Sequence, residues 1–327
     1  MIRTIMNTNS RFSIYKNRAK ILITSVLAIL ISLLGFIFSV NNSNYKFPLK
    51  LGLDFTGGTQ IRFESKCIEN KCKIINSNII QDTIKDISLS DDFKNSSVNL
   101  SNVNIQYLDD YSTVILRLPF LDSVKTKFII SSFEKNYDFF DLRKTSIDNI
   151  GPSLGKQLYK SSLISLLVAF LVISVYITFR FDRIFALLAL IALAHDIIIV
   201  CGIFSWLGLL FNVEVNSLFA VALLTISGYS VNDTVVIFDR IRELKNISDI
   251  PSYEKIDNAV NSTLTRTLYT SASTLLPLFS IVFLGGESLK IFAITLAAGI
   301  IIGSWSSIAL APALLTLTTR FKYVKNK

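Results

Sequence analysis

Two ionisable side chains interrupt the apolar stretches of this sequence. Asp233 lies within residues 215–238, six residues before Asp239, which begins the next polar segment. On a helix, Asp233 would lie about 9 Å inside that end. Arg266 lies near the start of the following apolar stretch, at a comparable depth. A charge at the centre of a membrane costs about 2.5–3.5 kcal/mol, so both residues are candidates for a functional site. A pair between Asp233 and Arg266 would offset much of the desolvation cost of each.

Each of these residues has polar neighbours on its own helix face. Tyr229 and Ser230 precede Asp233 by four and three residues, the spacing of one face of a helix. Two other interpretations stay open: a static salt bridge that fixes helix packing, or an arginine that extends to the lipid headgroups. The polar stripe that accompanies Arg266 consists of Thr263, Thr267, Thr270, Ser273 and Thr274.

His195 and Asp196 form a second polar pair, midway along residues 184–210. A histidine beside a carboxylate could relay protons, and it could equally be a buried hydrogen-bonded packing pair. Consecutive residues point about 100° apart on a helix, so the two need not act together. The sequence has no Walker motif, no nucleophile with an adjacent base and no glycine-rich phosphate loop. We therefore expect no enzymatic activity, no catalytic residue, no metal site and no bound cofactor.

Membrane-spanning helices would position these residues. Hydrophobic residues make up 51% of the chain and charged residues only 17%, and about twenty apolar residues suffice to cross a bilayer. Residues 21–40 are too long for a signal peptide and lack a small-residue cleavage site, so we predict an uncleaved first span. Gly299 and Gly303 have the spacing of a close helix–helix contact. The six predicted spans are residues 21–40, 161–179, 184–210, 215–238, 263–284 and 291–318.

The distribution of charge predicts the topology. Basic residues concentrate in the N-terminal segment 1–20, the loops 180–183 and 239–262, and the tail 319–327. With six spans all four lie on one side, which the positive-inside rule assigns to the cytoplasm. Both termini are therefore predicted to be cytoplasmic. The net charge of +9 lies largely beside the spans, which argues against nucleic-acid binding.

Residues 41–160 form the only long polar segment, and the topology places it outside the cytoplasm, in the periplasm. Its patterns predict strands at 52–64, 98–107, 112–118 and 138–147, with helices at 77–87 and 122–135. The order β-α-β-β-α-β predicts an α+β ferredoxin-like domain between the first and second spans. The overall fold class is thus an α-helical membrane protein with one α+β extracytoplasmic domain.

Two further segments give weaker signals. Cys67 and Cys72 lie five positions apart in the exported segment, where they could form a hairpin disulfide or remain free thiols. Residues 252–264 carry apolar positions at helical spacing, which predicts a helix on the inner membrane surface. Those positions are Tyr253, Ile256, Ala259, Val260 and Leu264.

Four segments resemble the signature segments of the SecF family, in order and at the matching places among the six spans. The segment 228–243, Gly-Tyr-Ser-Val-Asn-Asp-Thr-Val-Val-Ile-Phe-Asp-Arg-Ile-Arg-Glu, is highly specific by itself. The others are residues 51–59 with Asp54, Gly57 and Gly58, residues 150–155, and Ala194-His195-Asp196. Residues 264–267 are similar to the motif of the fifth span. The resemblance covers nearly the whole chain.

The resemblance implies an accessory subunit of protein export in the bacterial inner (plasma) membrane, within the resistance–nodulation–division superfamily. SecF proteins act with SecD and use the proton gradient, or sodium in some bacteria, to help draw preproteins from SecYEG. In the family, the aspartate of the Asn232–Asp233 motif and the arginine at Arg266 lie on the ion path. The implied partners are SecD, SecYEG, the translocating preprotein and membrane lipid, with YajC as a further candidate and no nucleic acid; the implied transported ion is H+.

Two other functions fit the same pattern of spans. One is half of a proton-coupled exporter of small molecules or lipids from the same superfamily, although such exporters usually carry two six-span halves and larger outer domains. The other is a translocon scaffold that conducts no ion. The scaffold predicts that Asp233 and Arg266 can be neutralised together without loss of function.

Overall fold

The computed structural model describes residues 13–42, 47–68, 71–72, 77–90, 93, 103–108, 112–137, 139–245 and 252–324. The chain divides into two compact units. One unit comprises Met1–Leu51 and Ser162–Lys327, and the other comprises Gly52–Ser161. Each unit is described below by itself.

Six helices in the described part of the chain are long and apolar enough to cross a membrane, which confirms the predicted number of spans. The last is interrupted by a π-helical segment, η2 (Ser306–Leu310), between α11 and α12. Helix α7 begins at Pro152, well before residue 161, because proline is favoured in the first turn of a helix. The helices are α2 (Ile14–Asn41), α7 (Pro152–Arg180), α8 (Arg183–Phe211), α9 (Ser217–Lys245), α10 (Ser252–Leu284), α11 (Glu287–Trp305) and α12 (Ala311–Val324).

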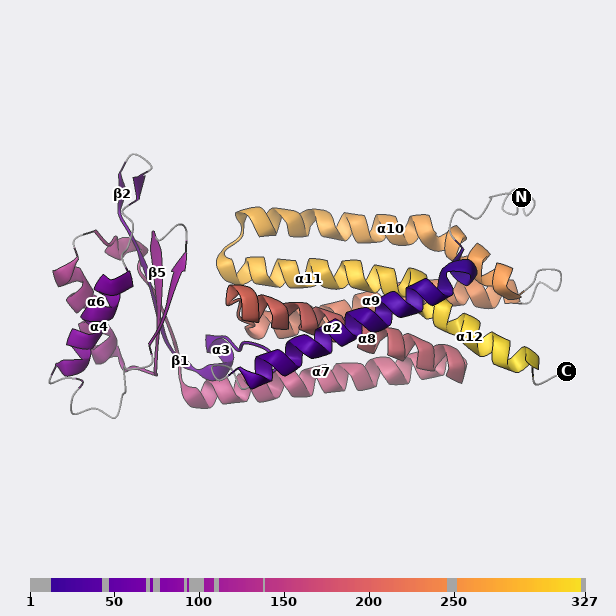
Figure 1. Ribbon diagram of the computed structural model, residues 1–327, viewed down its shortest axis with the longest axis horizontal. Coiled ribbons are helices and arrows are strands. Elements are labelled where there is room, and N and C mark those ends of the chain that lie inside the picture. The colour runs from indigo at the N-terminus through magenta and orange to yellow at the C-terminus, as the bar shows by residue number, and fades with distance from the viewer. Residues whose placement is uncertain are drawn as a thin grey trace. The chain divides into compact units, whose positions relative to one another are not determined.

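The long helices lie side by side in the first unit (Figure 1), and small residues allow the closest contacts. A Cβ atom at Gly202 of α8 would lie 2.2 Å from Ser32 Cβ of α2. A Cβ atom at Gly299 of α11 would lie 2.2 Å from Ile226 Cδ1 of α9, and one at Gly303 would lie 3.1 Å from Ser230 Cβ. The predicted close packing at these two glycines is thus confirmed. Close backbone approach of this kind is the usual way that membrane helices gain contact area.

The helix predicted at residues 252–264 is present, but it is not a separate element before the fifth span. These residues form the first turns of α10, which continues without a break to Leu284. Ile256, Ala259 and Val260 are buried in the core of the first unit, so their apolar face contacts protein instead of lipid. Asp257 lies beside them and binds the start of α2: its Oδ1 atom accepts a hydrogen bond from the Ile14 amide at 2.8 Å.

The second unit contains a four-stranded antiparallel sheet in the order β4-β5-β1-β6. Two helices cover one face of this sheet, where isoleucines of α4 and α6 pack against β1 and β5 (Figure 1). The described elements follow one another along the chain in the predicted alternation. They are β1 (Gly58–Glu64), α4 (Ser77–Leu89), β4 (Asn104–Leu108), β5 (Thr113–Leu118), α6 (Ser123–Asn136) and β6 (Ser146–Ile150).

Two strand boundaries differ from the prediction. The chain forms a helical turn, α3 (Leu53–Thr56), where the first strand was expected to begin, because Gly57 and Gly58 take φ of 69° and 131° and turn the backbone there. The last strand begins at Ser146, after a 3-10 turn, η1 (Leu142–Lys144). Earlier in that stretch, Phe140 forms an isolated bridge to Ser65. Residues 109–111, between the predicted strands 98–107 and 112–118, lie outside the described residues.

Candidate functional site

Asp233 lies on the buried side of α9, with 4% of its surface exposed. The side chain of Ser304, from α11, lies near this carboxyl group and interacts with it. Its Oδ2 atom has no hydrogen-bond partner within the described residues. A buried polar atom without a partner costs free energy in any protein and more in a membrane. The carboxyl group therefore leaves one oxygen for a proton or another donor.

Arg266 lies on α10, and its side chain is exposed. Its charge interacts electrostatically with Asp233, but the two side chains form no ion pair within 4.0 Å in the part of the chain that the structure describes. The structure thus brings the two residues near each other without joining them. This arrangement differs from the static salt bridge that the sequence left open.

Tyr229 and Asn232, the other two predicted site residues of α9, differ in where their side chains lie. The Tyr229 hydroxyl lies on the α10 side of the helix, 3.4 Å from Thr274 Oγ1. Asn232 points away and is exposed. A chain of hydroxyls also connects α11 to α10, since Ser304 Oγ lies 2.6 Å from Ser271 Oγ, which donates to the Thr267 carbonyl at 2.9 Å. Asp233 is therefore linked through Ser304 to the helix that carries Arg266.

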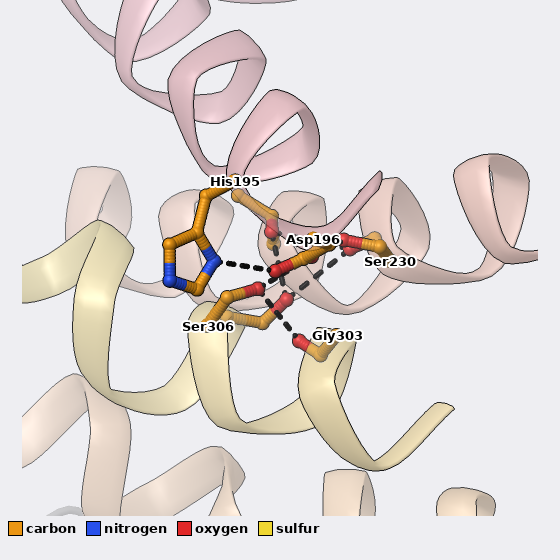
Figure 2. Close-up of polar contacts among 7 residues, drawn as sticks. His195, Asp196, Ser230, Gly303 and Ser306 are labelled. Carbon is orange, nitrogen blue, oxygen red and sulfur yellow. Dashed lines mark hydrogen bonds and ion pairs between the residues drawn. The ribbon is translucent and has the colours of Figure 1, made fainter. Parts of the chain in front are cut away.

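His195 and Asp196 are buried in α8 and contact each other directly, with 2.9 Å between His195 Nδ1 and Asp196 Oδ1 (Figure 2). The Oδ2 atom of Asp196 accepts hydrogen bonds from Ser230 of α9 and Ser306 of η2, each at 2.6 Å. Asp196 thus has three side-chain partners from three segments. Hydrogen bonds to a charged acceptor are about twice as strong as neutral ones, so this cluster holds the three segments together.

Sequence reasoning missed the serines of the last span. Ser304, Ser306 and Ser307 lie in and next to the π-helical segment, and all three are buried. Ser307 Oγ lies 2.8 Å from Thr234 Oγ1 and donates to the Ser230 carbonyl at 3.2 Å. The available signal was the run Gly303-Ser304-Trp305-Ser306-Ser307, which is unusually polar for an apolar span. π-helical turns are often found at functional sites.

The double-glycine segment packs against the start of α7 within the second unit. A Cβ atom at Gly57 would lie 2.9 Å from Pro152 Cα, and one at Gly155 would lie 2.8 Å from the Gly57 nitrogen. Residues 51–59 and 150–155 thus contact each other, although they are far apart in the sequence. Asp54 lies in α3 beside this contact and is half-buried. The contact explains why these positions are glycine, and it gives Asp54 no role in chemistry.

Cys67 and Cys72 lie in the second unit, and Cys201 lies in the first. The short strands β2 (Cys67–Ile68) and β3 (Lys71–Cys72) pair so that Cys67 stands opposite Cys72. The side chains of both residues lie outside the described part, so the disulfide stays a prediction. Cys201 is a free, half-buried cysteine of α8.

These features define a class: a multi-pass membrane protein with a folded α+β unit between its first and second spans and ionisable residues buried among the others. Profiles of two families match the chain. The profile described as "Protein export membrane protein SecD/SecF, C-terminal" matches residues 129–320, and the SecD/SecF GG motif matches residues 45–67. The chain therefore belongs to the SecD/SecF family of protein export membrane proteins.

Characterised relatives agree over almost the whole length. The protein translocase subunit SecF of Prochlorococcus marinus is 51% identical, over 95% of this chain and 97% of the relative. SecF of Synechocystis is 39% identical over 93% of both chains.

Solved structures of SecDF are also similar. The crystal structure of Thermus thermophilus SecDF, described as a translocon-associated membrane protein, superposes with a TM-score of 0.75 at 28% identity. It covers 95% of this chain, which spans 39% of that longer protein. A second SecDF structure, in a super-membrane-facing form, gives a TM-score of 0.62.

Proposed function

We propose that this chain acts with a SecD partner in protein export and uses the proton-motive force to complete the movement of preproteins through SecYEG. The observation that carries this proposal is the state of Asp233, a buried carboxyl group in a membrane helix. Among the described residues, its Oδ2 atom has no hydrogen-bond partner and Arg266, on the next helix, forms no ion pair with it. In a carboxylate with partners at both oxygens, binding a proton would disrupt existing hydrogen bonds. In Asp233, a proton or the Arg266 guanidinium would instead supply a partner for the oxygen that lacks one.

The proposed cycle has two states. In one, a proton neutralises Asp233 and Arg266 remains free, as its exposed side chain is here. In the other, the proton has left and the guanidinium approaches the carboxylate, with Ser304 beside it in both. One charge that crosses 100 mV releases about 2.3 kcal/mol. A few protons per cycle could therefore drive a movement of the helices that shifts the outer unit against an emerging preprotein.

The remaining parts of the proposal concern location and partners. We place the chain in the bacterial inner membrane, with both termini in the cytoplasm and residues 41–160 on the outer side. The reason is that basic residues concentrate in the termini and in the loops on their side of the membrane, and such loops usually face the cytoplasm. SecDF relatives, in which both parts form one chain, support SecD as the partner. The Thermus protein's description as translocon-associated supports an association with SecYEG; YajC, the preprotein and lipid are further proposed contacts.

We also propose a ferredoxin-like sandwich for the outer unit. The support is the sheet order β4-β5-β1-β6 with two helices on one face, which is the arrangement expected of a β-α-β-β-α-β chain. We propose that this unit carries out no catalysis. We also propose that the chain as a whole is not an enzyme and needs no cofactor. The role of the outer unit would be to contact the preprotein.

Complementation tests this function. Native SecF would be depleted in a bacterium, this chain would be supplied with its own SecD, and export of a secreted reporter would be followed with and without a protonophore. We expect rescue by the unaltered chain and loss of the protonophore-sensitive part in Asp233→Asn. Asp182→Asn is the matched control, because Asp182 is an exposed residue preceding α8, where asparagine is an equally good cap.

The alternatives predict other results. Equal rescue by the unaltered chain and Asp233→Asn, at equal protein levels, would contradict ion coupling and favour a scaffold. An exporter would leave reporter export unrescued and instead restore resistance to a toxic small molecule or lipid.

A further inference from the structure

Residues 47–51 lead from α2 into the outer unit, which begins at Gly52, and hydrogen bonds hold this segment on the first unit. Three of its carbonyl oxygens accept hydrogen bonds from three different parts of the first unit. The donors are Ser39 Oγ of α2 to Phe47 at 2.9 Å, Ser205 Oγ of α8 to Pro48 at 2.8 Å, and the Val215 amide, just before α9, to Lys50 at 2.9 Å. The backbone of the segment is therefore bound along most of its length.

The side chain of Lys50 adds a buried ion pair to these backbone contacts. Its Nζ atom lies 3.3 Å from Glu214 Oε1, and both charged side chains are only 9% exposed. The same Nζ atom donates to the backbone carbonyl and the side-chain oxygen of Asn212, at 3.3 and 3.2 Å. Asn212 ends α8 in the left-handed conformation, with φ of 58°, which asparagine adopts more readily than most residues. Gly208 gives the lysine room beside α8, since a Cβ atom there would lie 3.2 Å from Lys50 Cβ.

This ion pair contributes geometry more than stability. Removing two charges from water costs free energy that their attraction often only balances, so apolar side chains could stabilise the segment equally well. An ammonium group that meets three acceptors on one short loop, however, does so in a single placement of residue 50. Leu51 and Val215 form a parallel bridge in the same register. The contacts therefore fix the point at which the chain leaves the first unit.

The loop that binds Lys50 leads directly into α9. Glu214 and Val215 lie within three residues of the start of this helix, and the same helix carries Asp233. In the proposed cycle, movement of α9 would therefore also move the residues that hold Lys50. Lys50 is itself only two residues from the first residue of the outer unit. A short, tightly bound connection thus runs from α9 to that unit.

We propose that Lys50 is a positioning residue for ion coupling: with Asn212 and Glu214 it fixes the entry into the outer unit to the start of α9, so that movement of α9 is transmitted to that unit. This inference rests on the proposed function and adds the segment that carries the movement. Lys50 and Glu214 neither bind nor release the transported proton. The attachment stays closed throughout the cycle, because a link that opened would transmit no movement.

A reversible cross-link can replace the ion pair. Residues paired across neighbouring strands lie about 5 Å apart, which is within the Cα range of a disulfide, so Leu51→Cys/Val215→Cys should close one. Lys50→Met and Glu214→Gln are made with and without this cysteine pair, in a chain whose native cysteines are replaced by alanine. Lys290→Met is the matched control, because Lys290 is an exposed lysine near the start of α11, which the proposed topology also places on the outer side.

The assay is protonophore-sensitive export of the reporter in spheroplasts, with each full chain beside its SecD partner at equal membrane levels. We expect Lys50→Met to lower coupled export about tenfold, the factor for lost hydrogen bonds to a charged group. Glu214→Gln should lose less, since its amide oxygen still accepts from the lysine. Lys290→Met should match the unaltered chain.

Oxidation of the cysteine pair should restore coupled export in both Lys50→Met and Glu214→Gln, and a membrane-impermeant reductant should remove it again. Thiol labelling shows whether the disulfide has formed. Because oxidation and reduction act on the same molecules, altered expression or folding would not produce this change. The two variants are tested in the same way, so the result does not depend on the folding of either one.

Three results would overturn the positioning role. Unaltered coupled export in Lys50→Met would show that the pair is not needed. A cross-linked Lys50→Met that stays uncoupled would show that the charge itself acts. Loss of coupled export on oxidation of the cysteine pair in a chain that retains Lys50 would show that the segment must separate from the start of α9. Failure of the proposed function is distinct, since it would appear as full coupled export in Asp233→Asn.

Discussion

The two buried carboxyl groups of the membrane unit differ in how completely they are satisfied. Asp196 has partners at both oxygens from three segments, whereas Asp233, on the neighbouring helix, has Ser304 and one oxygen without a partner in the described part of the chain. A satisfied buried polar network makes a fold rigid, and an incompletely satisfied one is costly unless it has a use. The comparison indicates that Asp196 fixes structure and that Asp233 is reserved for exchange.

The two sides of α9 show the same contrast. Ile226 and Ser230 lie on a closed side, where Gly299 and Gly303 of α11 approach them closely. Gly228 and Asn232 lie on an open side: both are exposed, and no atom lies within 4 Å of a Cβ at Gly228. Asp233 lies on the closed side with Ile226 and Ser230, and its side chain is buried there.

A chemical probe gives the largest expected difference. A hydrophobic carbodiimide reacts with accessible carboxyl groups in membranes. We expect it to modify Asp233, which has one oxygen without a partner in the described part of the chain, and to leave Asp196 unmodified, because both oxygens of Asp196 are hydrogen-bonded. Peptide mass spectrometry of the treated, purified chain would locate the adduct. Modification of Asp196 at the rate of Asp233 would remove the distinction between the two groups.

Replacement of Asp196 should lower the stability of the chain more than replacement of Asp233. Asp196→Ala leaves His195, Ser230 and Ser306 without a partner in the core, and we expect it to lower the free energy of unfolding by about 3 kcal/mol. Asp233→Ala should cost about 1 kcal/mol, because it removes one polar interaction, with Ser304, and one unsatisfied atom. Thermal unfolding in detergent would measure both. A larger loss in Asp233→Ala would reverse our assignment of roles.

Glycine substitutions compare the closed and open sides of α9 directly. In Gly299→Ala the new methyl group would lie 2.2 Å from Ile226 Cδ1, and we expect overpacking to cost about 2 kcal/mol. Gly228→Ala enters open space, and we expect no loss, since alanine is about 1 kcal/mol better than glycine in a helix. The same unfolding assay applies. Equal losses at both positions would contradict the distinction between the closed and open sides of α9.

Asn232→Ala should have the smallest effect on stability, within about 0.5 kcal/mol, because its side chain is exposed and surface changes are usually of this size. The sharper measurement is co-purification with SecD. Retained stability with reduced co-purification would identify the open side of α9 as part of that contact, whereas lost stability would place Asn232 in the closed side.

The sequence was sufficient where a periodic pattern or a charge had a single physical meaning. Six apolar stretches predicted the six spans, and Asp233 could be recognised as buried because charges in apolar stretches are rare. The sequence was insufficient where an outcome depends on contacts between distant segments. The apolar face of residues 252–264 fitted lipid as well as protein, and only the packing of Ile256 and Val260 decided between them.

The serines around the two carboxyl groups show the same limit. A serine in an apolar span usually bonds its own helix, as Ser227 does. Nothing in the composition of 303–307 distinguishes that case from bonds to α8 and α9. The π-helical turn and the serine hydrogen bonds to α8 and α9 occur together. The sequence therefore could not predict the turn without the bonds, or the bonds without the turn.

The cap on α2 has a consequence for how the chain is made. The amides of Ile14 and Tyr15 donate to the Asp257 carboxylate at 2.8 and 3.2 Å, across 243 and 242 positions of sequence. During synthesis these two amides therefore lack the Asp257 acceptor until the ribosome has reached α10. Until then the helix start has its own Ser13 cap, whose hydroxyl accepts a hydrogen bond from the Lys16 amide at 3.4 Å. A nascent chain that stops before residue 257 would carry a first helix whose first turn is stabilised by local contacts alone.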